Sequence, residues 1–139
     1  MTRNLVGSII LVLSLAACGK SVESTAQVDT ESNLSIAESF IDAFYSFDRA
    51  RLQASLSSAQ GSVSSIVYYQ GWAEGGNYKI LERKTCHSEA PNLINCSITV
   101  QDDPMLALGI DFNVTDTFKI AFTNGEITSV TTSSNDLQV

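Results

Sequence analysis

Hydrophobic residues recur at helical spacing through the first half of the chain. Ser35 and Glu38 have the spacing of a capping box and predict that a first helix begins near Ser35. The apolar residues that follow form one stripe of an amphipathic helix: Ile36, Phe40, Ala43, Phe44 and Phe47. We therefore expect the phenylalanines of this helix to pack in the core.

Two further helices are predicted before the chain becomes strand-like. Asp48 can cap one over 49–56, and another covers 62–74 and ends at Gly75-Gly76, which suits a C-terminal cap. This third helix has two apolar faces, one with Val63, Ile66, Val67 and Ala73 and one with the aromatic residues Tyr68, Tyr69 and Trp72. Such a helix is expected between two layers or beside a cavity, and core packing is the first expectation for the aromatic cluster.

After Gly76 the hydrophobic period changes to two, which is typical of β-strands. Strands are predicted over 77–86 and 93–101, joined by a turn, and a third over 115–123 with Phe118, Ile120 and Phe122 on one face. Asn124-Gly125 favours a type I′ hairpin turn that leads into a last strand over 126–132. Three helices followed by about four antiparallel strands indicate an α+β fold.

The first residues follow a different pattern, that of an export signal. Arg3 precedes an apolar run over 5–15 that would be about 16 Å long as a helix, too short for a hydrocarbon core of about 30 Å. The run ends in Leu15-Ala16-Ala17-Cys18, which resembles the lipobox of bacterial lipoproteins. The resemblance implies that residues 1–17 are removed and that Cys18 carries diacylglyceryl and N-acyl (palmitate-type) chains. An ordinary secretory signal cut near Ala17 is the alternative.

A lipid on Cys18 sets the expected organisation of the rest of the chain. We expect a lipidated cysteine and flexible polar spacer over 18–33, one domain over 34–133 and a polar tail over 134–139. The membrane is then a partner through the lipid, because several acyl chains hold a protein firmly. Gly19, rather than aspartate, follows the cysteine and favours the periplasmic face of the outer membrane if the host is Gram-negative.

The charge and the cysteine content of the chain limit which partners and which sites are expected. Removal of residues 1–17 would take away Arg3 and leave seven basic against 15 acidic side chains, which disfavours nucleic acid as a partner. With Cys18 lipidated, Cys86 and Cys96 remain as a pair in an oxidising compartment, and we expect a disulfide. A metal site that uses both cysteines and His87 has too few ligands. We expect no metal and no cofactor.

The order and length of the elements resemble the NTF2-like superfamily, which includes SnoaL-like and ketosteroid-isomerase-like domains. The resemblance covers about 34–133 and includes the Tyr68-Tyr69-Gln70-Gly71-Trp72 segment, the cysteine hairpin, and the hairpin with Phe118 and Asn124-Gly125. It implies N-terminal helices in the concavity of a curved antiparallel sheet, with a pocket at the wide end of the cone. A cystatin-like domain, which also packs helix on sheet, is the alternative.

The resemblance implies either a binding module or an acid–base enzyme. A non-enzymatic domain for a small apolar ligand or an envelope protein is the first hypothesis, with Asp42, Tyr45, Tyr68, Tyr69 and Trp72 as pocket candidates. The alternative is an isomerase-like enzyme with an aspartate base and a tyrosine donor facing an apolar cavity. Its candidate bases are Asp42, Asp102, Asp103 and Asp111. Asp42 is expected to be exposed to solvent, and Asp102-Asp103-Pro104 is expected to form a turn. The candidate donors are Tyr45, Tyr68, Tyr69 and Tyr78.

Overall fold

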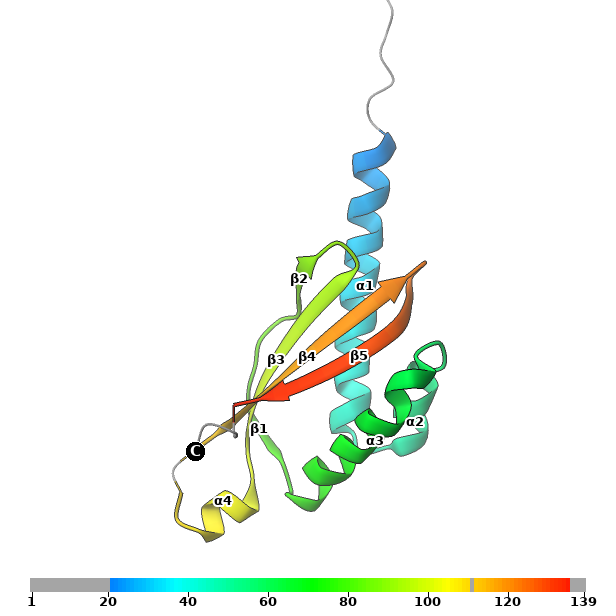
Figure 1. Ribbon diagram of the computed structural model, residues 1–139. Coiled ribbons are helices and arrows are strands. Elements are labelled where there is room, and N and C mark those ends of the chain that lie inside the picture. The colour runs from blue at the N-terminus through cyan, green and yellow to red at the C-terminus, as the bar shows by residue number, and fades with distance from the viewer. Residues whose placement is uncertain (1–20, 111, 136–139) are drawn as a thin grey trace, which may run out of the picture.

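The structure, a computed structural model, describes residues 21–110 and 112–135 and has the predicted α+β class. Three helices precede a curved antiparallel sheet of five strands (Figure 1). The elements are α1 (Ser21–Tyr45), α2 (Arg49–Ser55), α3 (Gln60–Gly75), β1 (Lys79–Arg83), β2 (His87–Ala90), β3 (Leu93–Gln101), α4 (Asp103–Ala107), β4 (Val114–Thr123) and β5 (Glu126–Ser134). The predicted signal peptide, the lipid site at Cys18 and the end of the predicted tail lie outside the described residues.

Helix α1 begins at Ser21, so the predicted start near Ser35 is wrong. Ser35 lies inside the helix, where its carbonyl accepts a hydrogen bond of 2.9 Å from the hydroxyl of Ser39. The segment that we expected to be a spacer is therefore helical from Ser21 onward, and its first turns extend past the sheet (Figure 1). Within the described residues, no helix combines the length and the hydropathy that crossing a membrane requires.

Helices α2 and α3 follow the sequence prediction closely. Asp48 caps α2, since its carboxylate accepts hydrogen bonds of 3.0 Å from the amides of Ala50 and Arg51. Helix α3 runs from Gln60 to Gly75 and is fastened to the end of α1 through Gln70. The buried amide of Gln70 donates to the Phe44 carbonyl at 2.8 Å, so one polar side chain satisfies a carbonyl in the last turn of α1.

The sheet has the strand order β1-β3-β4-β5, and β2 pairs with β3 on the same edge as β1. The strand predicted over 77–86 is too long, because β1 ends at Arg83 and residues 84–86 form a gap before β2, which lies beyond the predicted strand. In this gap the amide of Cys86 donates to the carboxylate of Glu38 on α1 at 2.7 Å. Arg83 adds contacts to Glu38 at 2.6 Å and to Asp42 at 2.5 Å. Contacts with α1, rather than strand pairing alone, therefore shape this edge.

The hairpin between β4 and β5 has the predicted turn. Asn124 and Gly125 have φ angles of 52° and 78°, and two consecutive positive values are what a type I′ turn requires. Strand β5 continues to Ser134, so the predicted end at Thr132 is too early. On its open edge, the amide of Val130 donates to the hydroxyl of Ser62 on α3 at 2.9 Å. The last strand is thereby joined to α3 as well as to β4.

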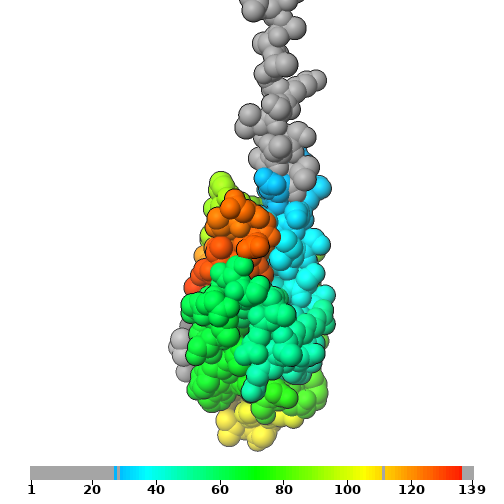
Figure 2. Space-filling model, turned by 90° about the vertical axis from the view of Figure 1, so that its right-hand side faces the viewer, coloured from blue at the N-terminus to red at the C-terminus, as the bar shows by residue number. Residues whose placement is uncertain are grey.

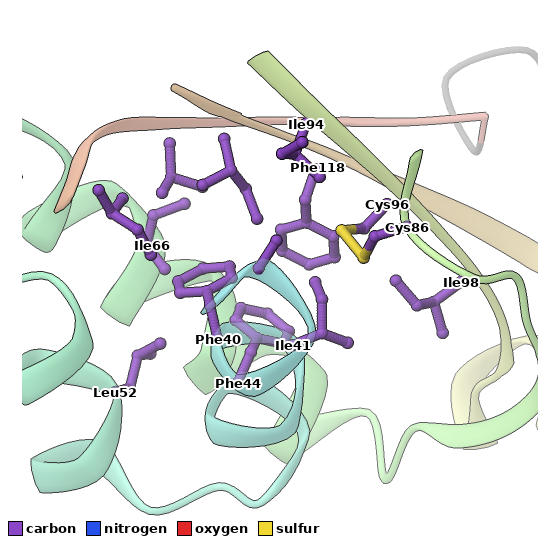
Figure 3. Packing of buried hydrophobic residues seen from close by; sticks show 14 of the residues in the cluster. Phe40, Ile41, Phe44, Leu52, Ile66, Cys86, Ile94, Cys96, Ile98 and Phe118 are labelled. Atoms are coloured by element: carbon purple, nitrogen blue, oxygen red, sulfur yellow. A yellow bond between two sulfur atoms is a disulfide. The ribbon is translucent and has the colours of Figure 1, made fainter. Parts of the chain in front are cut away.

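The core lies between the helices and one face of the sheet. Alternate residues of β3 and β4 are buried against α1 and α3. Phe40 and Phe44 of α1 pack edge-on against Phe118 of β4, with ring centroids 6.0 and 4.9 Å apart (Figure 3). The predicted phenylalanine stripe is confirmed for these two residues, whereas Phe47 lies beyond the end of α1, where it is partly buried and has a positive φ of 57°.

The predicted disulfide between Cys86 and Cys96 is present, with Cα atoms 4.4 Å apart. Both sulfurs lie in the core close to Phe118 and Ile98 (Figure 3). The bond joins the segment between β1 and β2 to the centre of β3 and holds the divided edge of the sheet together. The disulfide therefore has a structural role in this fold.

Replacing Cys86 and Cys96 together by alanine should lower the free energy of unfolding by about 3 kcal/mol, because the bond closes a short loop in the unfolded chain. Urea unfolding of the oxidised protein and the double variant measures the difference. Reduction of the wild-type protein should reproduce the loss. Equal stability of all three samples would show that the bond contributes nothing.

Candidate functional site

An open groove of about 1040 Å³ follows the outward side of α3. Its lining comes from α2, α3, the turn after α3, and α4, and we call it the outer groove. Figure 2 shows α2 and α3 side by side on this face, with α4 at its lower end. Apolar side chains form most of its surface, chiefly Val63, Val67, Tyr68, Trp72, Pro104 and Met105.

Two aromatic residues of α3 stand out into the groove. The side chains of Tyr68 and Trp72 are 69% and 61% exposed, and their rings meet edge to face with centroids 6.4 Å apart. The expectation that the whole aromatic cluster packs in the core is therefore wrong for these two residues. Large apolar side chains exposed together in a concave surface are typical of a binding site.

Tyr69 has the opposite orientation and points into the protein. Its hydroxyl donates a hydrogen bond to Oδ1 of Asp116 on β4. The hydroxyl of Tyr45, at the end of α1, donates to Oδ2 of the same carboxylate at 2.8 Å. Asp116 has no exposed surface, so the tyrosines replace the water that a carboxylate normally binds. The three residues form a buried Asp–Tyr cluster that joins α1, α3 and β4.

The Asp–Tyr cluster keeps the phenol of Tyr45 protonated. Burial, and next the negative charge of Asp116, raise the pKa of Tyr45 far above its ordinary value of 10.0. Tyr69 and Tyr78 raise this pKa further. Tyr78 also lines the outer groove. Gly76 leaves room for the Tyr78 ring, since a Cβ at residue 76 would lie 2.8 Å from a carbon of that ring.

Of the aspartates proposed as catalytic bases, Asp102 alone among the described residues lines the outer groove together with Tyr68 and Tyr78. Asp42 is exposed on α1 and pairs with Arg83, and Asp103 is exposed at the start of α4. Asp102 is mostly buried and lines the outer groove, but its Oδ1 accepts a hydrogen bond of 2.7 Å from the amide of Met105 and caps α4. Asp111 lies outside the described residues. The predicted turn at Asp102-Asp103-Pro104 is thus the beginning of a short helix.

Sequence reasoning missed Asp116, although the signal was available. Val114, Asp116, Phe118 and Ile120 alternate along β4 and are all buried. Since strand residues two apart share a face, the phenylalanine and isoleucine already placed Asp116 toward the core. A carboxylate on a buried face needs donors, and Tyr45 and Tyr69 were among the tyrosines already considered.

The described residues contain a second groove but no cluster of metal ligands. A smaller groove of about 270 Å³ lies between α1 and α2 and is lined in part by Ile36, Phe40 and Arg51. Within the described residues, no group of three or more histidine, cysteine, aspartate or glutamate side chains could hold a metal ion. The outer groove is the larger of the two grooves and the one with exposed aromatic side chains, which makes it the candidate binding site.

Comparisons with known proteins bear on the fold alone. No protein-family profile and no curated protein matches the chain. Among solved structures, a de novo designed β-sheet protein determined by solution NMR is similar, with a TM-score of 0.50 and 14% identity over 78% of this chain and 90% of that one. At this identity the likeness concerns the arrangement of the backbone and carries no function.

Proposed function

We propose that the chain is an envelope lipoprotein held in a membrane by lipid on Cys18. The Leu15-Ala16-Ala17-Cys18 motif supports the anchor, and the Cys86–Cys96 disulfide supports export into an oxidising compartment. The outer membrane is the proposed site if the host is Gram-negative, because Gly19 follows the cysteine. We further propose an NTF2-like domain, supported by N-terminal helices that pack on one face of a curved antiparallel sheet.

The anchored domain is a non-enzymatic binding module that takes an apolar ligand or an envelope protein in the outer groove. The observation that carries this proposal is the exposure of Tyr68 and Trp72 within a concave, mainly apolar surface. Exposing both rings to water is unfavourable, and a bound partner would remove that cost. Neither ring is needed to fill the core, so binding is the role left for them.

An isomerase-like enzyme is the alternative, and the Asp–Tyr cluster gives it one observation in its favour. Asp116, Tyr45 and Tyr69 do combine a carboxylate with phenol donors. A catalytic base, however, must lie within hydrogen-bonding reach of its substrate. Asp116 is fully buried and both of its oxygens already accept hydrogen bonds, so the arrangement favours a structural role.

Substitution of Cys18→Ser should move the protein from the membrane fraction to the soluble fraction of cells that express the full chain. Without the thiol no lipid is attached, and the remaining chain has an acidic surface that anionic headgroups repel. Immunoblots of fractionated cells measure the distribution. Retention of the variant in the membrane fraction would refute the lipid anchor.

The outer groove should bind the hydrophobic probe anilinonaphthalene sulfonate, and the double substitution Tyr68→Ala with Trp72→Ala should remove most of the fluorescence gain. Both side chains are exposed, so stability should change little. Leu81→Ala is the matched control, since Leu81 is 52% exposed on β1 and lies outside the groove. An equal signal from wild-type and double-variant protein would eliminate the groove as the binding site.

A further inference from the structure

We infer that the outer groove binds a long-chain carboxylate, a single-chain amphiphile whose head group pairs with Arg49. This inference deepens the proposed function and rests on it. It names the chemical class of the ligand and one residue that selects it. Three properties of the groove carry the inference: its length, its apolar walls and its single cationic side chain.

The groove is long and open. Its lining follows α3 from Val63 to Gly76, a stretch of about 20 Å at 1.5 Å per helical residue. Val67, Tyr68, Gly71 and Trp72 lie along the same stretch. A linear ligand can contact the whole length, whereas a compact ligand of similar volume would leave part of the exposed aromatic surface in water.

The apolar walls suit an alkyl chain. Val63 and Val67 belong to α3, and Pro104 and Met105 to α4, so hydrocarbon faces the groove from two elements. Methionine adapts its shape to a flexible ligand, which suits a chain with many conformers. Each methylene that leaves water contributes about 0.8 kcal/mol, so affinity should rise steadily with chain length.

Charge selects the head group. Arg49, the first residue of α2, is the only lysine or arginine in the groove lining. Among the described residues it makes no ion pair, so its guanidinium is available. The acidic residue of the lining, Asp102, is mostly buried and caps α4. A planar carboxylate matches the donor geometry of a guanidinium.

A single cationic side chain also limits the size and charge of the ligand. The chain as a whole has a formal net charge of −7, which disfavours polyanions and anionic surfaces. Helix α4, whose Pro104 and Met105 line the groove, lies at the end of the protein opposite the first turns of α1 (Figure 1). A ligand therefore reaches the groove from water rather than from the membrane that would hold the anchor, which favours a soluble single-chain amphiphile over a membrane phospholipid.

The test uses Trp72, the only tryptophan of the chain, in full-length protein that carries Cys18→Ser. Laurate, dodecyl maltoside and dodecyltrimethylammonium each have a chain of twelve carbons, with the carboxyl carbon of laurate included, and differ in head-group charge. Each is titrated below its micellar concentration while the emission of Trp72 is recorded. Laurate should shift the emission to shorter wavelength and bind most tightly, and the cationic amphiphile most weakly.

Arg49→Gln should weaken laurate binding about tenfold and leave dodecyl maltoside binding unchanged, because only laurate loses a charge-assisted hydrogen bond. Arg51→Gln is the matched control on the same helix, since Arg51 lines the smaller groove instead. Urea unfolding shows whether the variants are folded.

The outcomes separate this inference from the proposed function. Equal binding of laurate to wild-type protein and Arg49→Gln overturns the inference, and so does equal binding of all three amphiphiles. In both cases the proposal that the outer groove binds an apolar partner stands. If no amphiphile binds while anilinonaphthalene sulfonate does, the ligand class is wrong and the binding role stands. If neither binds, both proposals fail.

Discussion

A buried carboxylate, that of Asp116, determines how the helices meet the sheet. A charge without water is costly unless hydrogen bonds replace its hydration. The replacement donors are Tyr45 at the end of α1 and Tyr69 in the middle of α3. Each phenol must reach β4 from its own helix, so the cluster fixes the position of both helices at once. Phe44 and Phe118 pack around it and exclude water.

The orientation of α3 then creates the outer groove. With Tyr69 directed at Asp116 and Gln70 at the end of α1, the next face of the helix must turn outward. Tyr68 and Trp72, four residues apart, share that outward face. The exposed aromatic surface is thus a consequence of core packing on the opposite side of the helix. The proposed binding site and the core depend on the same element.

The sequence predicted the parts of the fold that local pattern governs. Alternation identified β3 and β4, Asn124-Gly125 identified a hairpin, and Asp48 marked the start of α2. Prediction from the sequence failed where contacts between residues far apart in the chain determine the structure. Helix α1 begins at Ser21 rather than near Ser35, and the amide of Cys86 donates to Glu38 on α1 instead of extending the first strand. The candidate site was found in part, because spacing alone did not separate inward Tyr69 from outward Tyr68.

The adjacent substitutions Tyr69→Phe and Tyr68→Phe test the central role of Asp116 most directly. Each removes one hydroxyl from neighbouring residues of the same helix, and urea unfolding measures the cost. Tyr69→Phe should lower the free energy of unfolding by about 1.5–3 kcal/mol, since it takes a donor from a buried carboxylate. Tyr68→Phe should change it by less than about 0.5 kcal/mol, because that residue is exposed. Equal stability of the two variants would contradict the account.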